Sequence, residues 1–239
     1  MPWDFWLIFF ILAVLIPWRG RVRLQHLLTL PAVGPKEKLV LYGSTIAFQW
    51  LLAGIVAWRS IARGLTLAQL GLARPISSDL LLLSFVGAIP FGAFQWFNLR
   101  RVGRMTGAIP EFMRKLAERV LPQSPLEFAP YCALALTAGI CEEFLYRGFA
   151  MAALTRLGLS AWLVVVISSA LFGLAHTYQG KTGVVGTTLM GLVLGGVRAA
   201  VRTLVPVVLW HAVVDIVAGV AGPKYLRETS VRTNSIEII

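Results

Sequence analysis

A long apolar segment, about residues 128–154, contains the stretch Cys141-Glu142-Glu143-Phe144-Leu145-Tyr146-Arg147-Gly148. Two adjacent carboxylates and a guanidinium therefore lie within six residues of an otherwise hydrophobic run. Ionisable side chains at bilayer depth cost roughly 2.5–3.5 kcal/mol each, so they are found mainly where they pair, line a polar cavity or carry function. These three ionisable side chains are therefore expected to interact with polar groups from elsewhere in the chain.

The composition of the chain is that of a polytopic membrane protein. Of its 239 residues, 57% are hydrophobic and 14% are charged, and the mean hydropathy is +0.76. A soluble domain carries about 25% charged residues. Spans of about 20 residues, the length that crosses a bilayer, use most of the chain. We predict an all-α, polytopic transmembrane helix bundle of about seven spans, at 3–18, 39–58, 79–99, 128–154, 161–178, 183–200 and 204–222.

The predicted organisation has three parts. Residues 1–127 hold N-terminal transmembrane helices and an interfacial helix, residues 128–222 hold a core with the intramembrane polar groups, and residues 223–239 form a tail. The first span has no basic segment before it and no small-residue cleavage site, which indicates a retained span and not a signal peptide. The interfacial helix is predicted at 110–121, where apolar and charged residues occupy opposite faces, and we interpret it as a connector in preference to a substrate lid.

The basic residues are expected to set topology and to contact lipid. The net charge is +11, but Lys and Arg lie in short connectors beside apolar spans, which disfavours nucleic acid as a partner. Fifteen of the 22 fall in the first, third and fifth connectors and the tail, and six in the other connectors. The positive-inside rule then predicts an outside N-terminus and a cytoplasmic C-terminus.

Smaller features predict packing. Cys132 and Cys141 are nine residues apart in one predicted helix, too distant for a disulfide, so we expect both to be packing residues. Gly191-x-x-x-Gly195 in the sixth span is typical of a face on which two helices pack closely.

Intramembrane polar chemistry is concentrated on three predicted helices. The fourth carries Glu142, Glu143 and Arg147, the fifth ends near His176, and the seventh carries His211 and Asp215. Residues four apart share a helix face, so the Glu143 carboxylate can pair with the Arg147 guanidinium while Glu142, about 100° round the helix, stays available. The histidine and aspartate of the seventh helix share a face for the same reason. We expect all three spots to converge in a cavity open to the cytoplasmic half.

These residue types suit hydrolysis of a peptide bond. Hydrolysis needs an activated water and a stabilised oxyanion; glutamate and histidine can accept the water's proton, and histidine can stabilise the oxyanion. The sequence has no Gly-x-Ser-x-Gly and no His-Glu-x-x-His. A zinc site built from His176, His211 and Asp215 stays open, because two histidines and a carboxylate are known catalytic zinc ligands.

Three ordered motifs carry a family resemblance. They are Glu142-Glu143-x-x-x-Arg147, Phe172-x-x-x-His176 and His211-x-x-x-Asp215. Together, over about residues 128–220, they resemble the CAAX-processing protease and bacteriocin-processing family of intramembrane proteases. The resemblance implies an all-helical membrane endopeptidase in which Glu142 and His176 activate water and the third motif stabilises the oxyanion. It predicts six catalytic-site residues: Glu142, Glu143, Arg147, His176, His211 and Asp215.

Asp215 stands where the best-studied members of that family have asparagine. An ionised aspartate cannot donate a hydrogen bond to an oxyanion. Three roles are open: Asp215 is protonated, it orients a positively charged His211, or it is a metal ligand. Phe172 is expected to pack beneath His176.

The predicted function is that of an intramembrane endopeptidase acting on a membrane-anchored peptide or protein. We expect that the reaction requires no cofactor, and zinc is the alternative. The expected partners are the substrate and the lipid bilayer. Ala/Arg/Gly/Val-rich usage suggests a prokaryotic plasma membrane. One alternative is a non-catalytic bacteriocin-immunity or scaffold protein. An ion-coupled transporter is disfavoured, because no paired interrupted helices occur in two matching halves.

Overall fold

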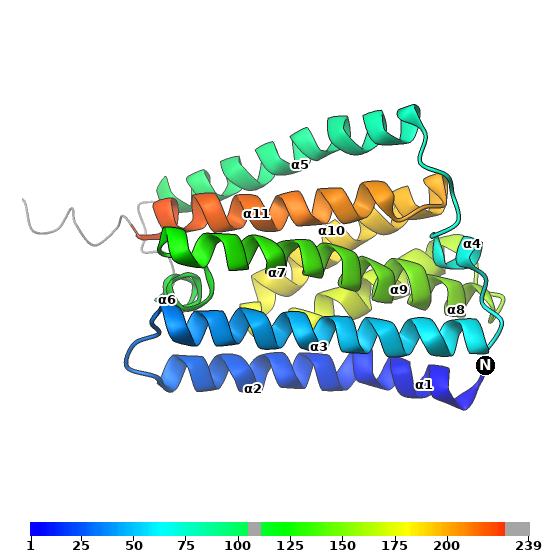
Figure 1. Ribbon diagram of the computed structural model, residues 1–239, viewed down its shortest axis with the longest axis horizontal. Helices are drawn as coiled ribbons and strands as arrows, with labels where there is room; N and C mark the ends of the chain where they lie inside the picture. The colour runs from blue at the N-terminus through cyan, green and yellow to red at the C-terminus, as the bar shows by residue number, and fades with distance from the viewer. Residues whose placement is uncertain (105–110, 228–239) are drawn as a thin grey trace, which may run out of the picture.

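The computed structural model describes residues 1–104 and 111–227, and the regular elements in these ranges are all helices, as predicted (Figure 1). Among these described residues, six helices are long and apolar enough to cross a membrane, and Ala161–Ala175 is a shorter apolar helix. Pro110, the predicted start of the interfacial helix, and residues 228–239 of the predicted tail lie outside the described residues. The elements are α1 (Trp3–Phe10), η1 (Ile11–Leu15), α2 (Ile16–Thr29), α3 (Pro35–Ala62), α4 (Leu67–Leu70), α5 (Ser78–Arg104), α6 (Glu111–Val120), α7 (Pro125–Glu143), η2 (Phe144–Ala150), α8 (Met151–Thr155), α9 (Ala161–Ala175), η3 (Thr177–Gln179), α10 (Gly180–Val201) and α11 (Val205–Arg227).

The first helix extends well past the predicted end of its span. From α1 through η1 to α2 the chain is helical up to Thr29, because Arg19 and Arg23 lie along α3 instead of ending the helix. The Arg19 guanidinium carbon lies 4.1 Å from the centroid of the Phe48 ring, and Arg23 donates a 3.0 Å hydrogen bond to Thr45 Oγ1. Long cationic side chains can cover apolar surface in this way while the backbone stays helical.

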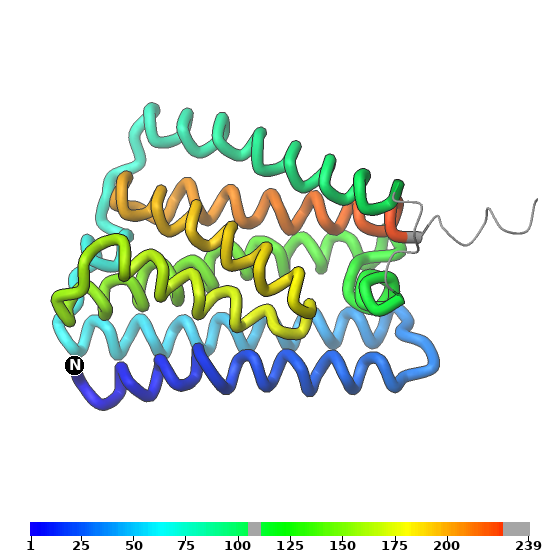
Figure 2. The backbone as a smooth tube through the Cα atoms, turned by 180° about the vertical axis from the view of Figure 1, so that it is seen from behind, coloured from blue at the N-terminus to red at the C-terminus, as the bar shows by residue number. Residues whose placement is uncertain are grey.

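The long helices run roughly side by side (Figures 1 and 2). Helix α3 packs on α7, α7 packs on α11, and α5 packs on the outer side of α11. The N-terminus and the end of α11 lie at opposite ends of the bundle. Helix α11 continues through Pro223 to Arg227, so the first residues of the predicted tail are helical.

Helix α6 runs across one end of the bundle and is seen nearly end-on in Figure 1. It confirms the predicted amphipathic helix from Glu111 onward. Two side chains of α3 hold its carboxyl end: Tyr42 Oη donates to the Val120 carbonyl at 2.7 Å, and Lys38 Nζ donates to the Leu121 carbonyl at 2.7 Å. These contacts satisfy terminal carbonyls that have no partner inside the helix.

The helices α9 and α10 pack closely through the predicted glycine face. A Cβ atom added to Gly191 would lie 3.0 Å from Ser169 Cβ, and one added to Gly195 would lie 3.1 Å from Val165 Cγ1. Both distances are shorter than ordinary van der Waals contact, so the two backbones approach at this separation because the glycines lack side chains.

The helix with the two glutamates changes pitch directly after them. Between α7 and α8 the segment η2 is π-helical, a form that often occurs at functional sites. Ser168 Oγ of α9 donates a 2.7 Å hydrogen bond to the Tyr146 carbonyl within this segment. The wider turn is therefore supported by a neighbouring helix. Cys141, just before it, is a fully buried free thiol in the main apolar cluster, as expected of a packing residue.

Candidate active site

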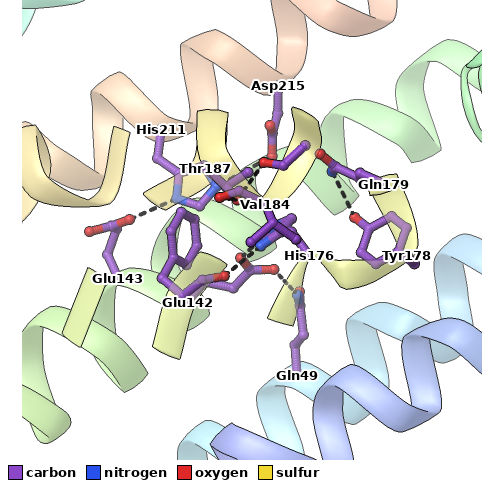
Figure 3. A network of polar contacts seen from close by, with 12 residues as sticks. Gln49, Glu142, Glu143, His176, Tyr178, Gln179, Val184, Thr187, His211 and Asp215 are labelled. Carbon is purple, nitrogen blue, oxygen red and sulfur yellow. Dashed lines mark hydrogen bonds and ion pairs between the residues drawn. The ribbon is translucent and has the colours of Figure 1, made fainter. Parts of the chain in front are cut away.

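The six predicted site residues come together between three parts of the chain: the end of α7 with η2, the residue that follows α9, and α11. Figure 3 shows five of them: Glu142, Glu143, His176, His211 and Asp215. Their side chains form two layers that differ in burial. The inner layer is Glu143, Arg147 and His211, and the outer layer is Glu142, His176 and Asp215.

The inner layer is centred on one oxygen of Glu143. Its Oε1 accepts a hydrogen bond from Arg147 Nη1 at 2.8 Å and lies 2.8 Å from His211 Nδ1. The glutamate and the arginine are 0% exposed. Because an ionised carboxylate only accepts hydrogen bonds, His211 Nδ1 carries a proton. The predicted i, i+4 ion pair is confirmed, and the structure adds the histidine from α11.

The aromatic ring of Phe172 connects the three motifs. It lies 4.2 Å from the Arg147 guanidinium carbon, and its centroid is 4.7 Å from that of His176 and 5.6 Å from that of His211. It therefore packs against His176, as predicted, and also against the other two motifs. A Cβ atom on Gly191 would lie 3.1 Å from Arg147 Nη2, so this glycine leaves room for the guanidinium.

The outer layer contains a carboxylate and an imidazole that face each other. Glu142 Oε2 lies 3.9 Å from His176 Nε2, and the two side chains are 19% and 12% exposed. His176 Nδ1 lies 2.8 Å from the Phe172 carbonyl oxygen, which can only accept. The proton is therefore on Nδ1, and in the neutral ring Nε2 keeps its lone pair. Unlike Glu143, both side chains are partly exposed, but Glu142 Oε2 itself is buried and has no hydrogen-bond partner among the described residues.

The other oxygen of Glu142 is bound by a residue that the sequence did not single out. Gln49 Nε2 of α3 donates a 2.7 Å hydrogen bond to Glu142 Oε1. The second predicted span, 39–58, has no site motif, and its only signal is a single amide within a mainly apolar run.

Asp215 completes the outer layer and is its most accessible member. Its side chain is 35% exposed, and Oδ2 lies 3.6 Å from His211 Nε2, beyond ordinary hydrogen-bond length. The predicted shared face of these two residues on α11 is confirmed. Tyr131 Oη of α7 donates a 3.0 Å hydrogen bond to the Asp215 carbonyl, which ties this point of α11 to the helix that leads into the glutamates.

The donor atoms do not gather as a zinc site. Within residues 1–104 and 111–227, no group of three or more His, Cys, Asp or Glu side chains is arranged so that it could hold a metal ion. His211 Nδ1 is directed to Glu143 and His176 Nδ1 to a backbone carbonyl, so each ring offers only Nε2.

These features define the class of protein as a membrane-embedded helical protein with a buried, charge-compensated ion pair and, next to it, a partly exposed carboxylate–imidazole pair. Residues 124–217 match the family of type II CAAX prenyl endopeptidase Rce1-like proteins. The matched segment carries all six site residues and supports the resemblance to the CAAX protease family that the three motifs predicted. The matched family is a protease family. Together with this match, the six apolar helices of spanning length within residues 1–104 and 111–227 indicate an integral membrane protein. Comparisons with curated proteins and with solved structures found no match.

Proposed function

We propose that this protein is an intramembrane endopeptidase that hydrolyses a peptide bond of a membrane-anchored peptide or protein with a water molecule activated by Glu142 and His176. The family match supports a protease role. The observation that carries the mechanism is the Glu142–His176 pair, 3.9 Å apart, in which Glu142 Oε2 has no hydrogen-bond partner among the described residues. The basic connectors support a C-terminal end on the cytoplasmic side.

The geometry of the pair suits a shared water. A separation of 3.9 Å is too long for a direct hydrogen bond. A water oxygen about 2.8 Å from each atom would hold them at an angle of roughly 90°. Glu142 Oε2 and His176 Nε2 are both acceptors, so each accepts one hydrogen bond from the water, and an oxygen lone pair remains to attack the substrate carbonyl. The carboxylate accepts one proton during attack and returns it to the leaving amine, so water is added across the peptide bond.

The oxyanion is stabilised from α11. The His211 ring lies between two carboxylates, Glu143 at 2.8 Å and Asp215 at 3.6 Å, and Arg147 compensates the charge of only the first. A second proton on the His211 ring, at Nε2, would balance the charge of the Asp215 carboxylate. We therefore assign His211 as the positively charged donor to the developing oxyanion and Asp215 as the group that favours its charge.

The direct test is cleavage of candidate membrane-anchored peptides by the purified protein in detergent. The wild-type protein is expected to form product with and without a zinc chelator, and His176→Ala is expected to form none. Loss of product on chelation and recovery with zinc would replace the glutamate mechanism by a metal-dependent one. Equal product from both proteins would show that the cleavage does not use this site.

Asp215 gives a second test, of the oxyanion assignment. Asp215→Asn is expected to keep kcat within about tenfold, because its amide can itself donate a hydrogen bond to the oxyanion. Asp215→Leu is expected to lose about 10²-fold, the usual effect of removing an oxyanion-stabilising group. The measurement is kcat on the same peptide. If the asparagine variant is as impaired as the leucine variant, the carboxylate acts in another way.

A further inference from the structure

The structure assigns a positioning role to Gln49: its side-chain amide holds the Glu142 carboxylate in the orientation that faces His176. The inference rests on the proposed function, in which Glu142 is the base. It extends the site to α3, which lies outside the matched segment 124–217.

The amide fixes one carboxylate oxygen and thereby orients the other. Gln49 Nε2 donates to Glu142 Oε1 at 2.7 Å, while Oε2 of the same carboxylate faces His176 Nε2 at 3.9 Å. Figure 3 shows the glutamine and the histidine approaching this carboxylate from different parts of the chain. With one oxygen held, rotation of the carboxylate about its terminal bond is restricted, and the free oxygen stays directed at the imidazole.

Burial indicates that the amide serves more than packing. Gln49 Oε1 is buried and has no hydrogen-bond partner among the described residues. Leaving a buried acceptor unpaired is costly, so an apolar side chain would pack α3 against α7 more favourably. What the amide supplies in return is its N–H group, at the carboxylate that accepts the water's proton in the proposed reaction and has to be ionised to do so.

Other contacts already join α3 to α7. Trp50 Nε1 donates to Thr137 Oγ1 at 3.3 Å, Lys38 Nζ pairs with Glu127 Oε2 at 3.0 Å, and the rings of Tyr42 and Tyr131 lie 5.7 Å apart. The two helices therefore do not depend on Gln49 to stay together. The tryptophan next to it, whose hydrogen bond also reaches α7 but not Glu142, provides a matched control.

The ionised form of Glu142 depends on several neighbours besides Gln49. His176 faces it from the end of α9, and further titratable or charged groups lie around it on α7, η2, η3 and α11: Cys141, Glu143, Tyr146, Arg147, Tyr178, His211 and Asp215. Among the described residues, Gln49 is nevertheless the group whose hydrogen bond to this carboxylate is direct.

The test compares Gln49→Met, Trp50→Phe and Glu142→Ala in the full-length protein with wild type. Gln49→Met is expected to lower kcat by about 10- to 100-fold, the effect of losing a hydrogen bond to an ionised group, with KM within about threefold. The acidic limb of its pH–kcat profile is expected to move to higher pH, because the bond that stabilises the ionised carboxylate is gone. Trp50→Phe is expected to leave kcat and the profile near those of wild type.

The outcomes separate the two proposals. If Glu142→Ala is inactive while Gln49→Met has wild-type kcat and pH profile, or matches Trp50→Phe, the positioning role is wrong and the proposed function stands. If Glu142→Ala is as active as wild type, the proposed function itself fails. A second readout does not need a substrate: carbodiimides modify protonated carboxyl groups, and labelling of Glu142 can be followed by mass spectrometry. Labelling should be several-fold faster in Gln49→Met at neutral pH, and equal rates would overturn the inference.

Discussion

Replacing Glu142 by glutamine is expected to lower kcat by a factor of about 10² to 10⁴, the contribution of a positioned general base. Glutamine has nearly the same shape and can still contact Gln49, so the helix and the pocket should keep their arrangement. Its amide cannot accept the proton of the attacking water. KM should therefore change little, since the loss falls on the chemical step. The measurement is the rate of product formation by equal amounts of purified wild-type and variant protein.

The control for this variant is Glu118→Gln, which removes an exposed carboxylate of α6 that pairs with Arg114 on the same helix. It should have wild-type kcat, because surface ion pairs contribute little and this one is remote from the site along the chain. Wild-type kcat in Glu142→Gln, with a monodisperse protein and normal membrane levels, would mean that another group takes the proton.

Replacing Arg147 by methionine is expected to destabilise the protein by about 3–5 kcal/mol, the usual effect of removing one partner of a buried ion pair. Glu143 and Arg147 are both 0% exposed, so the carboxylate that remains cannot be solvated. Methionine is flexible enough to occupy part of the vacated space beside Phe172, which limits the loss of packing. The free energy of unfolding in detergent, or the thermal midpoint, measures the effect.

A double variant separates charge from packing. Adding Glu143→Gln to Arg147→Met removes the uncompensated charge and is expected to recover most of the lost stability. Activity should not return, because His211 then no longer faces an ionised carboxylate. If Arg147→Met alone unfolds like wild type, the ion pair does not stabilise the fold. If the double variant regains activity, Glu143 is not needed to hold His211.

Local periodicity predicted the parts of the site that lie within one helix. The pairing of Glu143 with Arg147 and the shared face of His211 and Asp215 both follow from a spacing of four residues. The contact between His211 and Glu143 joins residues 68 apart in the chain, and no local pattern specifies it. Gln49 was missed for the same reason, because a single amide in an apolar helix gives no sign of which neighbour it faces.

The differences in the fold also have physical causes. Hydropathy locates where a chain leaves the apolar layer, but a helix can continue beyond that point. The first helix does so because the long side chains of Arg19 and Arg23 lie along α3. The π-helical segment after Glu143 depends on a hydrogen bond from Ser168 on another helix, so the sequence of the segment itself could not reveal it.

The ring of Phe172 has a consequence for how such a protein can be recombined or redesigned. The Phe172 ring packs against Arg147, His176 and His211 at once. The three motifs therefore share one packing contact and cannot be exchanged independently. Exchanging a single motif-bearing helix with that of a relative would change how Phe172 packs against all three motifs. A chimera has to include Phe172 and the three motifs that it contacts from the same parent protein.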